Sequence, residues 1–309
     1  MPHIVDTLIE ERATGLRSRP MLWGTVRRFL YPILNYRSAI SIIDLLQSYQ
    51  GTDVFAWLSR RLQMSVEVKG LERLPERGLV VLVANHPAGI ADGIALWDAV
   101  KSKRQDITVF ANRDAIRAVP GLKDVIIPVE WQEQLRTRER SKETVRQTIK
   151  AFRDERLIIV FPSGRLAEPT IRGLVEREWM PSAINLAQKY DCPIVPVHIK
   201  ARSSWLYYVF YFISSELRDI TLFRELLNKS GQRYRIRIGA PFKARGDSTS
   251  LTRQLREFVA ERMPKGANSF APDRSGDNNP ECNSAISCVL DIATDADAAS
   301  HSDLNRPDR

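Results

Sequence analysis

Cysteine is scarce in this sequence. Only Cys192, Cys282 and Cys288 occur among 309 residues. Such an odd and sparse set does not provide the disulfide framework on which small secreted domains depend. The scarcity therefore predicts a protein of a reducing compartment.

Long apolar runs are also missing. The most apolar stretch, Trp205–Ile213, is far shorter than the roughly 18–20 residues that span a bilayer. The N-terminus lacks the charged and then apolar order of a signal peptide. We therefore expect a cytoplasmic protein that is peripherally associated with the cytoplasmic face of the membrane.

Two further kinds of motif are absent. His3, His198 and His301 have no partners at ligand spacing, so no metal site is predicted. No Gly-x-Ser-x-Gly elbow occurs, which argues against a hydrolase in which a histidine activates a serine.

Positive charge, by contrast, is abundant. Residues 266–309 hold eight acids and three bases, a net charge of −5, whereas the whole chain carries +9. Residues 1–265 therefore carry +14. A chain this basic suits an anionic partner, either nucleic acid or anionic lipid, or simply has a solvated surface rich in arginine. Because no recognised nucleic-acid motif is present, we expect no nucleic-acid partner.

Short β-rich runs separated by helical stretches fill the centre of the chain. This alternation predicts an α/β fold with a mostly parallel central sheet flanked by helices. Helices are expected from Ser141 to about Asp154, over roughly Met180–Tyr190 and from about Ser250 to Met263. The predicted strands are Leu79–Ala84, Ile107–Ala111, Val125–Val129, Leu157–Phe161, Ile194–Ile199 and Tyr234–Ile238.

The two ends of the chain differ from this centre. Residues 1–66 have apolar residues at helical spacing and arginines among the aromatic residues, which predicts an N-terminal amphipathic helical segment. Its apolar stripe either meets a membrane or packs on the main domain, and the pattern does not choose between them. Residues 67–265 are predicted to form the main domain. Residues 266–309, rich in Asp, Asn, Ser and Ala, are predicted to be a disordered acidic tail.

A histidine and an aspartate stand near the end of the first predicted strand of the main domain. Asn85, His86 and Pro87 follow that strand, and Asp92 lies six positions after His86. On one continuous helix this separation would point the two side chains apart, so they meet only if His86 lies in a turn before the helix, where Gly89 allows the chain to fold back. A carboxylate bonded to one imidazole nitrogen leaves the other nitrogen as a base. A purely structural histidine is the competing interpretation.

A second predicted strand ends in a glycine and an arginine. Gly164 lets backbone N–H groups approach an anion, and Arg165 can grip a phosphate or carboxylate with two parallel bonds. The alternative is an ordinary turn with a surface arginine. Ligand crevices lie at the carboxyl ends of strands in open α/β sheets, so two such strand ends in one sheet favour a single site.

Together these motifs resemble the glycerophosphate and lysophospholipid acyltransferase superfamily. The order and spacing match across roughly residues 67–243, and the chain is most similar to the bacterial hemolysin-like branch, which includes ornithine-lipid-type acyltransferases. The matching blocks are Asn85-His86-Pro87 with Asp92, Val109–Arg113, Phe161-Pro162-Ser163-Gly164-Arg165 and Pro193–Val197.

Two positions depart from the common superfamily pattern. Five residues, rather than four, separate His86 from Asp92, a spacing that resembles a branch variant. Ser163 stands where the third block commonly carries a glutamate that is linked in the family to acceptor binding, and Arg165 directly follows Gly164. The missing glutamate argues against a lysophosphatidate acceptor.

The resemblance implies an O-acyltransferase that moves a fatty acyl group from acyl-CoA or acyl-carrier protein to a hydroxyl of a lysolipid, such as a lysophospholipid or a lyso-ornithine lipid. His86 would be the general base and Asp92 would orient it. No metal or cofactor is implied, and the expected partners are the donor and a membrane lipid surface. A non-catalytic lipid-binding relative of the same fold is the alternative, which the intact His86 and Asp92 disfavour. The candidates for substrate binding are Arg113, Ser163, Gly164 and Arg165.

Overall fold

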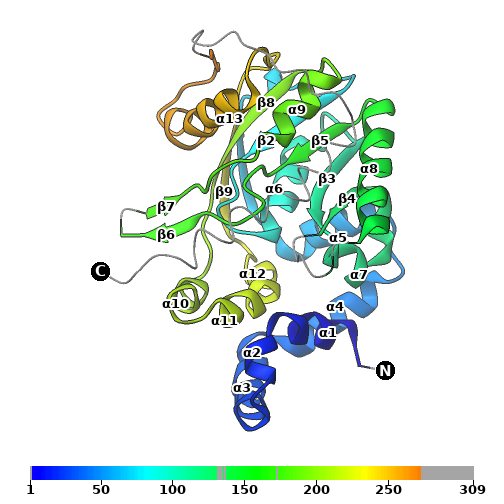
Figure 1. Ribbon diagram of the computed structural model, residues 1–309, viewed down its shortest axis with the longest axis vertical. Helices are drawn as coiled ribbons and strands as arrows, with labels where there is room; N and C mark the ends of the chain where they lie inside the picture. Colours follow the sequence, from blue (N-terminus) through cyan, green and yellow to red (C-terminus); the bar gives the residue numbers. More distant parts are fainter. Residues whose placement is uncertain (1, 131–134, 136, 172, 273–309) are drawn as a thin grey trace.

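A seven-stranded sheet forms the centre of the protein. The computed structural model describes residues 2–130, 135, 137–171 and 173–272. The strands of this sheet are β1 (Ser65–Lys69), β2 (Val80–Ala84), β3 (Ile107–Asn112), β4 (Ile126–Val129), β5 (Leu157–Val160), β8 (Ile194–Lys200) and β9 (Arg233–Ile238). Their order is β1-β9-β8-β2-β5-β3-β4, and neighbouring strands are parallel except β8 with β9 (Figure 1). The predicted α/β fold is confirmed.

The central strands are buried on both faces. Every residue of β2 and β5 is buried. Successive side chains of a strand point to opposite faces, so Val80 and Leu82 join one hydrophobic cluster whereas Val81 and Val83 join the other. Burial on both faces explains why these strands are continuous apolar runs in the sequence.

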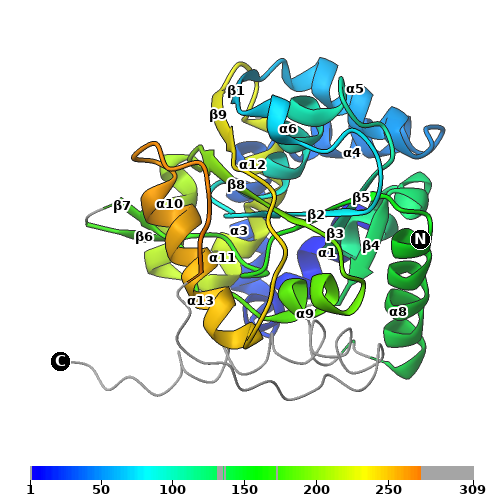
Figure 2. The ribbon, with the colours of Figure 1, turned by 90° about the horizontal axis from the view of Figure 1, so that it is seen from above.

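Helices cover both faces of the sheet (Figures 1 and 2). The helices of the main domain are α6 (Ile90–Val100), α7 (Asp114–Ala118), α8 (Arg138–Arg153), α9 (Ser182–Lys189), α10 (Trp205–Ile213), α11 (Ser215–Ile220), α12 (Leu222–Leu227) and α13 (Ser248–Glu257). α6 packs in the first cluster, and α8, α9 and α13 pack in the second. The three predicted helices are therefore present, and the last of them ends in a π-helical turn, Phe258–Arg262.

Element ends and short strands differ from the sequence-based expectation. α8 starts before Ser141 because the Thr137 side chain caps it, accepting a hydrogen bond from the Arg140 backbone N–H at 3.3 Å. The hairpin of β6 (Glu168–Thr170) and β7 (Gly173–Val175) was not predicted, since strands of three residues show no usable periodicity. It projects beside α10 and α11 (Figure 1).

The N-terminal segment is helical, as predicted, and packs on the main domain. Leu30, Leu46 and Leu62 are buried in the same cluster as α6. Arg12 of the first helix bonds to Asp114 of α7 at 2.5 Å. β1 begins at Ser65, slightly before the predicted end of the segment at residue 66. The helices are α1 (Ile4–Arg12), α2 (Thr14–Arg17), α3 (Pro20–Ile33), α4 (Tyr36–Leu46) and α5 (Thr52–Leu62).

The packed domain extends past its predicted end at residue 265. Phe270 is buried and its ring lies 4.7 Å from that of Phe242 and 5.4 Å from that of Phe258, centroid to centroid. The start of the predicted tail is therefore part of the core. Residues 273–309, which make up the rest of that tail, lie outside the described residues. Within the described part of the chain, no helix has both the length and the apolar character needed to cross a bilayer.

Candidate active site

His86 lies at the edge of the sheet where the parallel strands β2, β5 and β8 end. It follows β2 by two residues, and Phe161 directly follows β5. The two rings stack with centroids 4.3 Å apart and planes inclined by 24°. The two strand ends that the sequence singled out are therefore adjacent in space.

The His86 imidazole and the Asp92 carboxylate form a hydrogen-bonded pair. Nδ1 of His86 lies 2.9 Å from Oδ2 of Asp92. His86 precedes α6, as the spacing of six required, and Gly89 turns the chain with φ of 91°. A Cβ at residue 89 would also lie only 3.3 Å from the Leu166 side chain, so glycine is needed there for conformation and for space. The His86 side chain is 16% exposed and that of Asp92 is fully buried, so only the histidine can be reached by a substrate.

Backbone donors fix the Asp92 carboxylate in place. The same Oδ2 accepts hydrogen bonds from the N–H of Ala88 at 2.9 Å and of Gly89 at 3.1 Å. Three donors on one oxygen leave the carboxylate little freedom to rotate. With Nδ1–H of His86 donating to this carboxylate, Nε2 is the nitrogen that can accept a proton.

Tyr234 of β9 is a site residue that the sequence did not reveal. It is fully buried, and burial followed by the influence of Asp92 raises the pKa of its hydroxyl. Among the described residues, neither this hydroxyl nor Asp92 Oδ1 has a hydrogen-bond partner of standard geometry. A small shift would let the hydroxyl donate to Oδ1 and satisfy both groups. A tyrosine in a strand that alternates arginines with apolar residues carries no signal of this role, because β9 meets α6 only in the folded protein.

The predicted anion-binding residues form a tight turn after β5. Gly164 has φ of 60°, and its N–H donates to the Phe161 carbonyl at 3.0 Å. The buried Ser163 donates its hydroxyl to the Arg165 carbonyl at 2.7 Å. The turn is thus held by its own hydrogen bonds next to the His86 ring. Its contact with a substrate stays a prediction.

Arg113 lies after β3 and is tied to α8. Its guanidinium pairs with Glu143, donates to the Arg140 carbonyl at 3.2 Å and lies 4.0 Å from Glu130. These contacts join the end of β3 to the helix that follows β4. A role of Arg113 in head-group binding likewise stays a prediction.

A second carboxyl group, that of Glu176, lies next to the backbone N–H of His86. Only 6% of this residue is exposed, and Trp179 donates its indole N–H to Oε1 at 3.0 Å. Burial raises the pKa of the Glu176 carboxyl, whereas the Trp179 bond and the charge of the nearby His86 lower it. Nothing in the local sequence marks Glu176, because the hairpin brings it back to β2 and β5.

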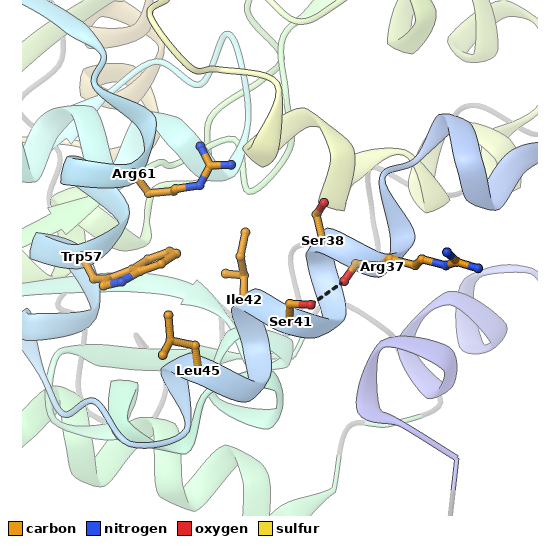
Figure 3. A pocket seen from close by; sticks show the side chains of 7 residues that line it. All are labelled: Arg37, Ser38, Ser41, Ile42, Leu45, Trp57 and Arg61. Atoms are coloured by element: carbon orange, nitrogen blue, oxygen red, sulfur yellow. Dashed lines mark hydrogen bonds between the residues drawn. The ribbon is translucent and has the colours of Figure 1, made fainter.

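Metal ligation and a surface cavity are two further features that bear on the choice of site. The described residues contain no group of three or more His, Cys, Asp or Glu side chains arranged to hold a metal ion. A shallow cavity of about 370 Å³ lies between α4 and α5, outside the His86 site (Figure 3). It is lined by Arg37, Ser38, Ser41, Ile42, Leu45, Trp57 and Arg61. The cavity offers no acid–base pair.

Residues 65–200 match the family model named Acyltransferase. This range contains His86, Asp92, the turn after β5 and Glu176. The match supports the predicted resemblance to the glycerophosphate and lysolipid acyltransferase superfamily. The chain is 26% identical to a lyso-glycine lipid O-acyltransferase of Phocaeicola vulgatus over 222 residues, which cover 70% of this chain and 78% of the relative.

The chain is also similar to a second curated relative and to a solved structure. A lyso-glycine lipid O-acyltransferase of Bacteroides thetaiotaomicron is 27% identical over 158 residues, covering 51% of this chain and 56% of that protein. The crystal structure of the 1-acyl-sn-glycerophosphate acyltransferase from Thermotoga maritima superposes with a TM-score of 0.43 at 18% identity, covering 86% of this chain and 97% of that one.

Proposed function

We propose that this acyltransferase transfers a fatty acyl group from acyl-CoA or acyl-carrier protein to a hydroxyl of a lysolipid, with His86 as the general base. The observation that carries the proposal is the 2.9 Å bond between His86 Nδ1 and Asp92 Oδ2 within an acyltransferase domain. Two relatives named as lyso-glycine lipid O-acyltransferases support a lysolipid as the acceptor.

The proposed reaction is a direct transfer between the two substrates. His86 Nε2 takes the proton of the acceptor hydroxyl while its oxygen attacks the carbonyl carbon of the donor thioester. The tetrahedral intermediate then collapses, the C–S bond breaks, and the imidazolium returns the proton to the departing thiolate. Asp92 stabilises the positive charge that His86 carries in between. General base catalysis of this kind typically contributes about 10²–10⁴-fold.

The turn after β5 would bind an anionic part of either substrate. It lies on the same sheet edge as His86, and its Gly164 leaves the backbone open to a close approach. Arg165 would supply the charge, because a guanidinium can hold a phosphate or carboxylate through two parallel bonds. Arg113 would have to leave its contacts with α8 to take part in such binding.

We further propose that α3 and α10 attach the enzyme to the membrane surface. α3 buries Trp23 and Leu30 but exposes an apolar set, and arginines 17, 19, 27 and 28 around it are exposed. α10 follows β8 and so starts at the sheet edge that holds His86. Exposed apolar side chains beside arginines suit an anionic lipid interface. The exposed set is Met21, Leu22, Phe29 and Ile33 on α3, with Trp205, Val209, Phe212 and Ile213 on α10.

The activity is tested with purified protein, labelled acyl-CoA and acyl-carrier protein, and a panel of lysolipids. The panel contains lyso-glycine lipid, lyso-ornithine lipid, lysophosphatidylcholine and lysophosphatidate. We expect a diacylated product with the wild type and none with His86→Ala. A folded wild type that forms no product from either donor would instead support the non-catalytic lipid-binding alternative.

Membrane attachment is tested by sedimentation with vesicles that contain anionic lipid. Phe29→Ser and Phe212→Ser should each lower the bound fraction, and the two together should lower it further. Leu45→Ser is the matched control, since Leu45 is an exposed leucine of α4, outside both apolar sets. Binding of the double variant at the wild-type level would refute attachment through α3 and α10.

A further inference from the structure

The mechanism above leaves one buried ionisable group beside the base unused. Glu176 directly follows β7, at the base of the hairpin, and is almost fully buried. Burying a carboxylate is costly unless hydrogen-bond donors surround it. The contacts of the Glu176 side chain explain why it is buried next to His86.

The carboxylate joins three segments of the site. Oε1 accepts the indole N–H of Trp179 at 3.0 Å, and Oε2 lies 3.4 Å from the backbone N of His86, whose N–H points to it. The Ser163 hydroxyl lies beside the same carboxyl group and opposes in part the rise in its pKa that burial causes. One side chain therefore contacts the loop after β2, the turn after β5 and the segment after β7.

The peptide groups of His86 are held from both sides by this region. The Glu176 carboxylate meets the N–H, and the carbonyl accepts the N–H of Ala167 at 2.9 Å. Met180 donates its N–H to the Pro162 carbonyl at 3.1 Å, and this bond ties the segment after β7 to the turn after β5. The main chain of His86 is thus fixed by residues that lie between β5 and α9.

We propose that Glu176 is a positioning residue that sets the direction of His86 Nε2. Asp92 fixes the ring from one side through Nδ1, and Glu176 fixes the main chain from which the ring projects. The common third block of the superfamily has glutamate at the position of Ser163; in this chain a carboxylate reaches the same turn from residue 176. The inference rests on the proposed function, since it needs His86 to act as the base.

The test compares Glu176→Gln, Glu176→Asp and the control Glu178→Gln in steady-state kinetics with a fixed donor. Glutamine keeps the size of the side chain, but its NH₂ group is a donor, so it cannot accept from both Trp179 and His86. We expect kcat to fall about 10- to 100-fold with the acceptor KM within about twofold, because a small misplacement of a catalytic group costs about that much. Glu176→Asp keeps the carboxyl group and should recover part of kcat. Glu178 is exposed, so Glu178→Gln should match the wild type.

Three results would overturn the inference. The first is a wild-type kcat in Glu176→Gln. The second is a raised acceptor KM at unchanged kcat, which would make Glu176 a substrate contact. The third is a lowered melting temperature at unchanged kcat per folded enzyme, which would make the role structural. His86→Ala is assayed in parallel; if it stays active, the proposed function itself has failed.

A second variant and a spectroscopic signal keep the test independent of folding yield. Trp179→Phe removes the indole donor but keeps an aromatic ring, and it should lower kcat by about fivefold, in line with the loss of one hydrogen bond. The Nδ1 proton of His86, bonded to Asp92, should give a downfield proton resonance that is lost in His86→Ala. We expect this resonance to shift or broaden in Glu176→Gln and to stay unchanged in Glu178→Gln. An unchanged resonance in Glu176→Gln would contradict a positioning role.

Discussion

His86 and His198 lie on neighbouring strand segments, yet their surroundings give them opposite properties. β2 pairs with β8, so His86 follows one strand and His198 lies within the other. His86 has a carboxylate on Nδ1 and a partly exposed ring. The environment of His198 is apolar and cationic, and burial, with Arg237 and Lys200 nearby, lowers its pKa from 6.5 to about 4.

The difference shows what makes a histidine useful as a base. His198 bonds to the Val259 backbone, and among the described residues its Nδ1 has no hydrogen-bond partner. It is therefore neutral and a poor acceptor of protons at neutral pH. His86 combines access with a negative partner, which would favour the protonated ring that the proposed reaction forms.

The contrast between His86 and His198 predicts that only His86 is needed for turnover. We expect His86→Ala to lower kcat by about 10³-fold or more, whereas His198→Ala should keep most of the turnover per folded protein. Steady-state rates, normalised to folded protein by circular dichroism, check this. Equal losses of kcat in His86→Ala and His198→Ala would show that the two histidines do not differ in function.

Asp92→Asn tests whether the carboxylate partner of His86, rather than the location of His86 in the sheet, makes this histidine an effective base. The amide keeps the shape of the carboxylate but cannot supply a negative charge, and its NH₂ group favours the wrong tautomer of His86. We expect kcat to fall about 10²-fold or more with an unchanged fold. The rate of the variant at saturating acceptor is the relevant measurement; a rate within threefold of wild type would mean that Asp92 only caps α6.

Tyr234→Phe tests whether the Tyr234 hydroxyl supports the Asp92 carboxylate, and it should lower kcat less than Asp92→Asn does. The variant removes the hydroxyl beside Asp92 Oδ1 but keeps the aromatic ring that fills the core. We expect kcat to fall about fivefold, because one hydrogen bond is worth about 1 kcal/mol. Tyr207→Phe, which deletes another buried hydroxyl, is the control and should leave kcat unchanged. Equal rates for the two variants would exclude Tyr234 from the site.

The smallest effect should come from His198 and appear in stability rather than in rate. Its pKa is about 4 in the folded protein and 6.5 for an ordinary histidine, so between these values the unfolded chain binds a proton that the folded chain does not. The free energy of unfolding should therefore fall as the pH drops from about 6.5 to about 4. Urea unfolding at several pH values should show a flatter dependence for His198→Gln. An equally steep dependence in that variant would assign the effect to other groups.

Much of the framework followed from local sequence. Continuous apolar runs identified β2, β5 and β8 because strands buried on both faces need them, and the six-residue spacing of His86 and Asp92 required a turn at Gly89. The structure places that turn where it was expected. The resemblance to an acyltransferase superfamily rested on the same short motifs.

Other features appeared only in the tertiary structure. Tyr234 and Glu176 lie far along the chain from His86, and no spacing rule connects residues that different strands bring together. The burial of Phe270 inside a polar, acidic stretch was hidden for the same reason, since its partners are Phe242 and Phe258.

The sequence by itself determined the sheet and the pairing of His86 with Asp92, because these depend on periodicity and short spacing along one chain segment. Only the tertiary structure decided which groups support that pair and how His198 differs from His86. Those properties depend on desolvation and on charges from other elements, which the order of residues along a segment does not contain.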